Sequence, residues 1–459
     1  MMKALRYLLV LFAAIPFRTW GQQPVDPAFA TALQDKIDSC VNVYALPGMS
    51  VGLLLPGDRY WRGASGVAHR YTLQPMDTSL LFQQASVTKL FTAALVMQLV
   101  DEGSVQLDDT VGEYLPAITH VPSGVRIRDL LRHRSGIADH LGNPGVANAW
   151  LLSPNVIWNP GEAIAVFGEE PSGVPGVSFA YSNPNFILLG MIIEEVTGVD
   201  LATALRTRIS EPLGLEDTFL RPADPLDGMI TPGWSSLSVP NSYTDDMTGF
   251  LSPAFSSMVG GAGALVSTPW DVVRFTEALF TGEVVPLALV DTMCITTSVG
   301  LGANTTGYGY GTMRYSFGGV TYHGHSGDIN GFTQLTVHQR TTGVTLTISI
   351  NRNNAPRGPI AAALLQVITA QLAVGMSAMP TDEERLLMFP NPVDETLYVM
   401  GSGPLRYRLF DASGREVLVG NVLDAQTAAI DVSVLAPGHY HCLLERHGVR
   451  RVFQNIIVE

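Results

Sequence analysis

The chain has 459 residues, 46% of them hydrophobic and 15% charged, and its formal net charge is −14 at pH 7. This composition excludes a disordered polypeptide and leaves room for two or three globular domains. The acidic balance argues against nucleic acid or an anionic membrane as a partner. We therefore expect a small molecule or a peptide as the ligand.

Residues 1–21 contain basic residues, an apolar run at 8–15 and small residues before Gln22. This pattern is typical of a secretory signal peptide and is too short to span a membrane. Three cysteines, Cys40, Cys294 and Cys442, are too few and too widely spaced for a disulfide framework or a zinc site. We expect free thiols, although one bridge remains an alternative.

The first predicted elements, in chain order, are a helix at 27–45, strands at 48–55 and 59–68, and a buried helix at 85–103. Short helices follow at 107–115 and 125–134, an irregular stretch at 142–176, and helices at 185–197, 201–209 and 269–280. Strands are then predicted at 308–315, 319–325, 332–339 and 344–351, and a closing helix at 359–374. This order indicates an α+β domain over 22–375, in which both ends of the domain join one antiparallel sheet.

A polar linker is predicted at 376–385. After it, residues 386–459 read as about seven short strands separated by turns that contain Gly, Pro, Asn and Ser. This spacing favours a small all-β sandwich as a second domain.

The buried helix at 85–103 carries Ser86 and Lys89 at its start. Residues three apart share a helix face, so the hydroxyl and the amine should meet. The chain has only three lysines, Lys3, Lys36 and Lys89. Because arginine does not deprotonate in proteins and a buried lysine can, Lys89 is a candidate base for a serine nucleophile. The alternative is a lysine that extends to solvent from a helix end.

Two further polar clusters lie in apolar surroundings. Tyr181, Ser182 and Asn183 precede a predicted helix, where a capping turn is the alternative interpretation. Residues 322–328, YHGHSGD, end a predicted strand, where a structural histidine or a His-x-His metal pair would also fit. Since no carboxylate or cysteine spacing nearby completes a metal site, we expect neither a metal nor a cofactor.

In order along the chain, Ser86-x-x-Lys89, Tyr181-Ser182-Asn183 and His325-Ser326-Gly327 resemble the three motifs of serine β-lactamases and penicillin-recognising hydrolases. The match is to the branch with class C β-lactamases, D-alanyl-D-alanine carboxypeptidases and esterases. Stretches at 127–137, 181–198, 260–269 and 308–311 support it, and the resemblance covers about 25–374. It implies an antiparallel sheet flanked by helices, with an all-helical subdomain.

The resemblance implies that Ser86 forms an acyl-enzyme, with Lys89 and Tyr181 sharing the acid and base work. Their unperturbed pKa values lie near about 10, so each must perturb the other. His325 would relay protons or add positive charge, and Asn183 would hold the substrate amide. A Ser-His-Asp site is less well supported, because the Gly-x-Ser-x-Gly pattern at 48–52 falls inside a predicted strand and not at a strand-to-helix turn.

Ser326, Gly327 and Asp328 would contact the substrate, with the N–H groups of Ser86 and Asp328 as the oxyanion hole. The charge of Asp328 would repel a substrate carboxylate. Arg314 could compensate for it unless Met313 occupies the inward register. We expect a D-alanyl peptide, a β-lactam or a related amide as substrate, with an esterase as the first alternative and a non-catalytic peptidoglycan or penicillin sensor as the second.

Segments at 389–392, 407–417 and 430–440 of the second domain resemble the C-terminal sorting domain of the type IX secretion system. This implies export through the periplasm of a Gram-negative cell to the cell surface or medium, with the secretion machinery as a partner. An ordinary β-sandwich accessory module is the alternative, and cleavage of the domain stays open.

Overall fold

The structure is a computed structural model that describes residues 23–238, 240–250, 252–302, 304–377, 387–389, 393, 396–400, 405–411, 415–422, 427–446 and 449–458. The chain divides into two compact units, of which the first ends at Val367 and the second begins at Ile368. The predicted signal peptide and residues 378–385 of the predicted linker lie outside the described residues. Residues 376 and 377, also assigned to the linker, belong to a helix.

In the described part of the first unit, the strands are β1 (Gln23–Pro24), β2 (Gly48–Leu55), β3 (Arg59–His69), β4 (Gln74–Pro75), β5 (Phe82–Gln83), β6 (Thr218–Leu220), β7 (Trp234–Ser235), β8 (Asp245–Asp246), β9 (Leu265–Ser267), β10 (Thr305–Tyr308), β11 (Met313–Phe317), β12 (Val320–Ile329), β13 (Phe332–Gln339) and β14 (Val344–Ile350). The main sheet has the order β1-β3-β2-β14-β13-β12-β11-β10, and β4 pairs with β3. Since β2 pairs with β14 in an antiparallel register that sets Ser50 opposite Ser349, both ends of the unit join one sheet, as predicted.

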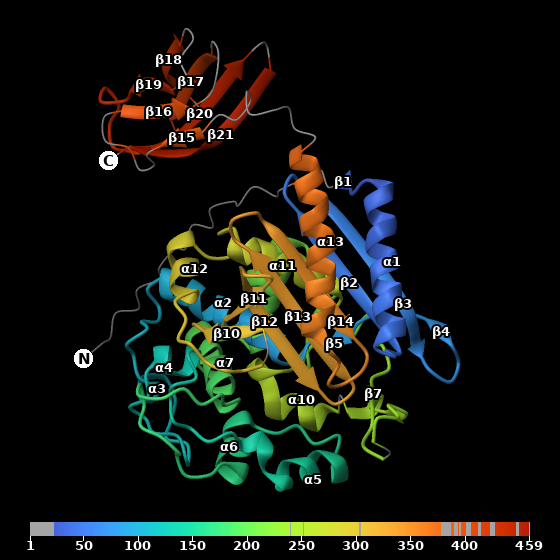
Figure 1. Cartoon of the computed structure of the whole chain (residues 1–459). Helices are drawn as coiled ribbons and strands as arrows, with labels where there is room; N and C mark the ends of the chain where they lie inside the picture. The colour runs from blue at the N-terminus through green and yellow to red at the C-terminus, as the bar shows by residue number, and fades with distance from the viewer. Residues whose placement is uncertain are drawn as a thin grey trace, which may run out of the picture. The chain divides into compact units, whose positions relative to one another are not determined.

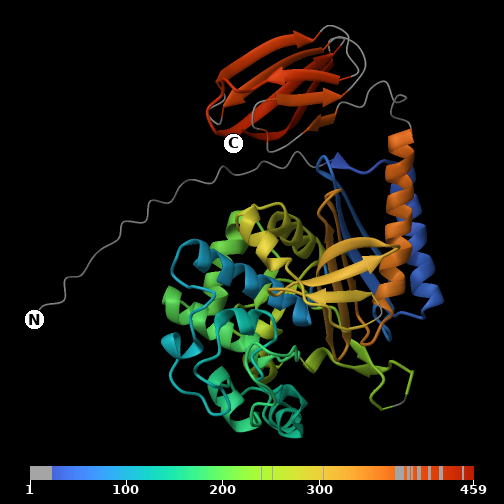
Figure 2. The same cartoon turned by 60° about the vertical axis from the view of Figure 1, so that its left-hand side comes forward.

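The helices of three or more residues are α1 (Pro27–Val43), η1 (Ala85–Val87), α2 (Thr88–Asp101), α3 (Val111–Tyr114), α4 (Ile127–Leu131), η2 (His140–Gly142), α5 (Pro144–Leu152), α6 (Pro160–Phe167), α7 (Pro184–Thr197), α8 (Leu201–Leu205), η3 (Arg206–Ser210), α9 (Glu211–Leu213), η4 (Thr248–Phe250), α10 (Pro253–Val259), η5 (Gly260–Ala262), α11 (Pro269–Phe280), α12 (Leu287–Met293) and α13 (Arg357–Ser377). Helices α1 and α13 cover one face of the sheet, and α11 packs on the other against β2, β13 and β14 (Figures 1 and 2). None of the helices in the described part of the chain has the length and apolar character needed to cross a bilayer.

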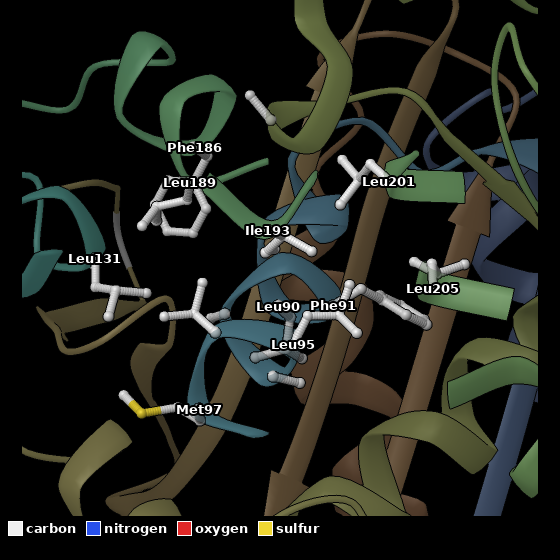
Figure 3. Packing of buried hydrophobic residues seen from close by; sticks show 14 of the residues in the cluster. Leu90, Phe91, Leu95, Met97, Leu131, Phe186, Leu189, Ile193, Leu201 and Leu205 are labelled. Atoms are coloured by element: carbon white, nitrogen blue, oxygen red, sulfur yellow. The ribbon is translucent and has the colours of Figure 1, made fainter. Parts of the chain in front are cut away.

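Helix α2 is the centre of the helical layer. It is apolar on every side, and Leu90, Phe91 and Leu95 are completely buried. Figure 3 shows Phe186 and Leu189 of α7 among the buried side chains near it. Burial on all faces needs cover on all faces, so the residues that begin this helix are placed rigidly between the sheet and the helical layer.

The stretch at 142–176, predicted to be irregular, contains the two helices α5 and α6. Each begins with the same pair, an asparagine followed by a proline. The side chain of Asn143 accepts from the N–H of Gly145, and that of Asn159 accepts from the N–H of Gly161. The prediction was wrong because asparagine is a good N-cap and proline is well suited to the first helical position, so the pairs begin helices instead of breaking them.

The strand predicted at 308–315 is in fact a hairpin formed by β10 and β11. Gly311 lies in its turn with a φ of +73°, a conformation that favours glycine. A Cβ atom on Gly311 would lie 2.3 Å from the Cβ of Ala93 on α2. The chain therefore turns where it meets the buried helix, a contact that local alternation does not reveal.

The second unit contains β15 (Leu387–Phe389), β16 (Thr396–Met400), β17 (Leu405–Asp411), β18 (Glu416–Val422), β19 (Thr427–Asp431), β20 (Gly438–Arg446) and β21 (Val449–Val458) among its described residues. They form two sheets with the orders β15-β16-β19 and β18-β17-β20-β21. Leu397, Leu409, Ile430 and Cys442 are buried in its core. Cys40, Cys294 and Cys442 are all free thiols, as expected.

Candidate active site

Ser86 lies on the sharp turn that joins β5 to α2. The predicted helix at 85–103 begins as the 3-10 turn η1, and the α-helix starts only at Thr88. Ala85, directly before the serine, has a φ of +48°, which non-glycine residues rarely adopt. The Thr88 hydroxyl donates to the Ala85 carbonyl at 2.6 Å. The half-buried Ser86 hydroxyl is thus presented by a strained turn that neighbouring groups hold in place.

Lys89 is completely buried, so it does not extend to solvent. Its Nζ lies 3.1 Å from Ser86 Oγ, 2.8 Å from Asn183 Oδ1 and 2.7 Å from the carbonyl oxygen of Ala262. Burial lowers the pKa of Lys89 to about 7, and the negative charge of Asp139 opposes part of that shift. Near neutral pH a substantial share of this amine carries no proton.

The three partners of Lys89 fix the direction of its lone pair. The Asn183 side-chain oxygen and the Ala262 carbonyl can only accept hydrogen bonds. A neutral amine therefore gives its two N–H groups to them, and its lone pair is left for the Ser86 hydroxyl. In this arrangement the lone pair of a neutral Lys89 is directed at Ser86 and at neither of the other two groups.

Asn183 occupies the N-cap position of α7, yet its side chain makes no capping bond. Its Oδ1 accepts from Lys89, and its Nδ2 donates to Asp139 Oδ2 at 2.8 Å. Because the carboxylate can only accept, it fixes which end of the amide faces the lysine. Sequence reasoning missed Asp139, which lies two residues beyond the supporting stretch at 127–137.

Tyr181 is half-buried against the same cluster. Its ring centroid lies 4.1 Å from that of His133, at an angle of 31°, and 5.1 Å from Lys89 Nζ. Burial raises the pKa of the Tyr181 phenol, while a hydrogen bond with Ser86 acts in the opposite direction. The phenol thus holds its proton at neutral pH beside the serine, and it can donate that proton.

His325 lies on β12, completely buried, in a line of three side chains. Its Nε2 is 3.2 Å from the hydroxyl of Tyr308, which lies 3.1 Å from Nε2 of His133. Its Nδ1 is 2.6 Å from the carbonyl oxygen of Ser326. Burial lowers the pKa of His325 to about 3, and the nearby Lys89 charge lowers it further. Within the described residues, the hydrogen bonds of its ring go to Tyr308 and Ser326, not to Ser86 or Lys89.

Gly327 brings β12 directly against η1. A Cβ atom here would lie 2.4 Å from the carbonyl oxygen of Gln84 and 3.0 Å from the backbone nitrogen of Ser86. Next to it, both carboxylate oxygens of Asp328 bind Nη1 of Arg357, at the start of α13. The charge of Asp328 is therefore paired, by an arginine that sequence reasoning missed.

Arg314 and Met313 are neighbours on β11, so their side chains point to opposite faces of the sheet. Arg314 donates to the side chain and carbonyl of Thr306 on β10. Met313 lies in the buried face of β11, and its sulfur accepts from the Ser326 hydroxyl at 3.6 Å. The structure thus brings Met313, and not Arg314, to the third motif.

Ser86, Asn183 and Asp328 open on one pocket of about 250 Å³, which we call the serine pocket. Its other walls are mainly apolar, and its lining is completed by Ala85, Leu141, Phe255, Val259, Ala262, Gly263, Ile329 and Asn330. Ser86 of the first motif, Asn183 of the second and Asp328, directly after the third, thus meet at one cavity, which can hold a small acyl group beside the serine.

Comparison with known proteins places the chain among hydrolases. Residues 33–371 match the Beta-lactamase family, and residues 387–459 match the secretion system C-terminal sorting domain. The chain is 31% identical to penicillin-binding protein 4 of Amycolatopsis lactamdurans over 66% of this chain and 81% of that protein. It is 29% identical to a putative D-alanyl-D-alanine carboxypeptidase of Escherichia coli over 68% of this chain and 80% of that protein.

Among solved structures, the D-amino acid amidase of Ochrobactrum anthropi superposes with a TM-score of 0.65 and 27% identity. The match covers 75% of this chain and 99% of the amidase. The sorting domain indicates a secreted or cell-surface protein that engages a secretion machinery. The chain belongs to the Beta-lactamase family of hydrolases and carries a secretion sorting domain behind its hydrolase domain.

Proposed function

We propose that this protein is a secreted serine hydrolase that acts through a Ser86 acyl-enzyme on a D-alanyl peptide, a β-lactam or a related amide. One observation carries the proposal: the amine of Lys89, with a pKa near 7, lies 3.1 Å from Ser86 Oγ. A neutral amine that donates its two N–H groups to other acceptors has its lone pair free to accept the proton of the serine hydroxyl.

In acylation, Lys89 takes the hydroxyl proton while Ser86 Oγ forms a bond to the substrate carbonyl carbon. The C–N bond then breaks, and the leaving nitrogen takes a proton from the Tyr181 phenol, whose raised pKa keeps it protonated until then. Transfer of the proton on the Lys89 ammonium to the Tyr181 phenolate then restores both side chains, and water later hydrolyses the ester to release the acid and the Ser86 hydroxyl. The backbone N–H groups of Ser86 and Asp328 are our candidates for binding the oxyanion.

The pairing of Asp328 with Arg357 bears on the substrate. An unpaired carboxylate in the serine pocket would repel a peptide with a free C-terminus, but the arginine cancels that charge. The apolar side chains of Leu141, Phe255 and Val259 suit a small hydrophobic acyl group. The names of the carboxypeptidase, penicillin-binding and amidase relatives support an amide bond as the one cleaved.

The proposal is tested by labelling the purified chain with a fluorescent penicillin and a fluorophosphonate, followed by intact-protein mass spectrometry. We expect one adduct on the wild type, none on Ser86→Ala, and an unchanged adduct on Ser210→Ala, a buried serine outside the serine pocket. An adduct that survives Ser86→Ala contradicts the proposal.

Turnover of a D-Ala-D-Ala peptide, a chromogenic cephalosporin, D-phenylalanine amide and nitrophenyl esters then separates the activities. Faster turnover of an amide supports the proposed substrate class, whereas turnover of esters alone favours an esterase. An adduct that forms but never hydrolyses points to the sensor.

A further inference from the structure

We propose that His133, Tyr308 and His325 form a one-way hydrogen-bond chain that joins the second motif to the third, holds the Tyr181 ring in place and keeps His325 uncharged. His325 is then a positioning residue and not the proton relay that the sequence suggested. The expected effect on turnover rests on the proposed function, whereas the hydrogen-bond chain itself does not.

The direction of the chain is set at its first member. The backbone N–H of Ser182 donates to His133 Nδ1 at 3.2 Å, and the side-chain nitrogen of Asn185 approaches the same atom at 3.0 Å. A backbone N–H can only donate, so Nδ1 carries no proton and neutral His133 must carry its proton on Nε2. That N–H then points at the Tyr308 oxygen.

The last member has its direction set independently. His325 Nδ1 faces the carbonyl oxygen of Ser326, which can only accept, so Nδ1 carries a proton. In the neutral ring Nε2 is then a bare acceptor, and it receives the hydroxyl proton of Tyr308. The Ser182 N–H fixes the proton of His133 and the Ser326 carbonyl fixes that of His325. Both require the same direction of hydrogen bonding through Tyr308.

Protonation of His325 would break this agreement. Tyr308 would then face N–H groups on both sides, and its own proton, fully buried, would lose its acceptor. The charged and titratable groups that act on these three side chains are Lys89, Tyr181, Tyr315 and Arg357. Both cations among them oppose a further positive charge, so they act in the same direction as the chain.

The hydrogen-bond chain also holds the Tyr181 ring in place. His133 stacks on the Tyr181 ring and binds the N–H of the next residue, and the ring of Tyr308 meets Tyr181 edge-on at 6.1 Å between centroids. A phenol that must donate to a leaving group needs a fixed ring, because small displacements reduce proton transfer sharply. Two of the three residues of the hydrogen-bond chain, His133 and Tyr308, therefore fix the position of Tyr181, the proposed acid.

The test is Tyr308→Phe in the full chain, with ring-¹⁵N histidine labels and assignment of the His325 signals through His325→Gln. In the wild type we expect His325 neutral and protonated on Nδ1 from pH 8 to pH 5. Because the wild-type midpoint lies below this range, at a pKa of about 3, the titration is extended to acid pH. In Tyr308→Phe we expect the midpoint of His325 protonation to rise by about one pH unit or more, because the neutral ring loses a donor. Tyr322→Phe, which removes the hydroxyl of a buried tyrosine outside the chain, serves as the control and should leave the His325 signals unchanged.

A wild-type His325 protonated on Nε2, or identical titrations in the wild type and Tyr308→Phe, overturns the chain. In kinetics, we expect Tyr308→Phe to lower kcat about tenfold with little change in KM, as loss of positioning predicts. An unchanged kcat overturns the role in seating Tyr181. If no variant hydrolyses any amide, the proposed function fails, while the resonance data still decide the chain.

Discussion

Two pockets of the first unit share one wall but hold different chemistry. Phe255 of α10 and Ala262 of η5 line the serine pocket, and Ser256 and Gly261 of the same two elements line a larger pocket of about 370 Å³. We call the larger one the tryptophan pocket, after Trp158 in its lining. It is mainly apolar and larger than the serine pocket, so volume and apolar lining would favour it over the serine pocket as a ligand site.

The polar groups of the two pockets are used differently. In the tryptophan pocket, Glu194 accepts from the backbone N–H of Leu201, and Asp200 caps α8. Both carboxylates therefore hold helices in place. In the serine pocket, Asn183 connects Lys89 with Asp139, so a polar side chain controls the orientation of another polar side chain. The proposed active site therefore differs from the larger pocket in having linked hydrogen bonds whose directions are fixed, and not in having a larger volume.

The largest expected effect comes from Lys89→Arg. Arginine keeps the positive charge but cannot release its proton, so the lone pair directed at Ser86 is lost. We expect acylation to fall by about 10³-fold, the range for loss of a general base. Stopped-flow labelling with a fluorescent penicillin measures it, and Lys36→Arg on α1 is the matched control. Acylation of Lys89→Arg at the wild-type rate would show that Lys89 is not the base, and it would contradict the chemical distinction between the two pockets.

The second effect is the pH dependence of the wild type. Because only the neutral amine of Lys89 accepts a proton, and its pKa is about 7, activity should fall as pH drops through 7. For one proton, kcat/KM should decrease about 100-fold between pH 8 and pH 5. His325, with a pKa of about 3, does not titrate in this window. A flat profile over this range, with circular dichroism showing an intact fold, would contradict the assignment of the base.

Gly327→Ala should have an intermediate effect. The added methyl group would meet the Gln84 carbonyl and push β12 away from the turn that presents Ser86. We expect about a tenfold loss of kcat/KM, since misplacement of reacting groups is costly. Gly124→Ala adds a methyl group where nothing lies within 4 Å, and it should change neither activity nor Tm. Equal behaviour of the two variants would show that the close approach is dispensable.

The smallest expected effects come from substitutions that compare the serine pocket directly with the tryptophan pocket. Leu141→Ala enlarges the serine pocket, and we expect KM for a hydrophobic amide to change by about threefold, as loss of apolar contact in a binding site predicts. Ala223→Leu adds bulk at the exposed edge of the tryptophan pocket, where we expect less than about a twofold change. Steady-state kinetics on both variants measures the contrast, and the reverse ranking would move attention to the larger pocket.

Much of the site could be predicted because its motifs lie at recognisable spacings. Ser86 and Lys89 are near neighbours in the chain, so helix geometry alone brings them together. The prediction that both ends of the first unit join one sheet also agrees with the observed strand order.

The partners that direct the chemistry were harder to find. Asp139 and Arg357 lie outside the three motifs and the supporting stretches, and each acts through its contact with a distant residue. No local pattern distinguishes them from ordinary surface or core residues of the same type. His133 did lie within a supporting stretch, but its role depends on the Ser182 N–H, whose position only tertiary packing determines.

Ala85, with its left-handed backbone, has a consequence for engineering. A glycine there would relieve a strain of about 1–2 kcal/mol without changing any side chain of the proposed active site. Selection for heat resistance should therefore favour glycine at position 85. The same change would loosen the turn that positions Ser86, the proposed nucleophile, so we expect a more heat-resistant variant found in this way to hydrolyse its substrate more slowly.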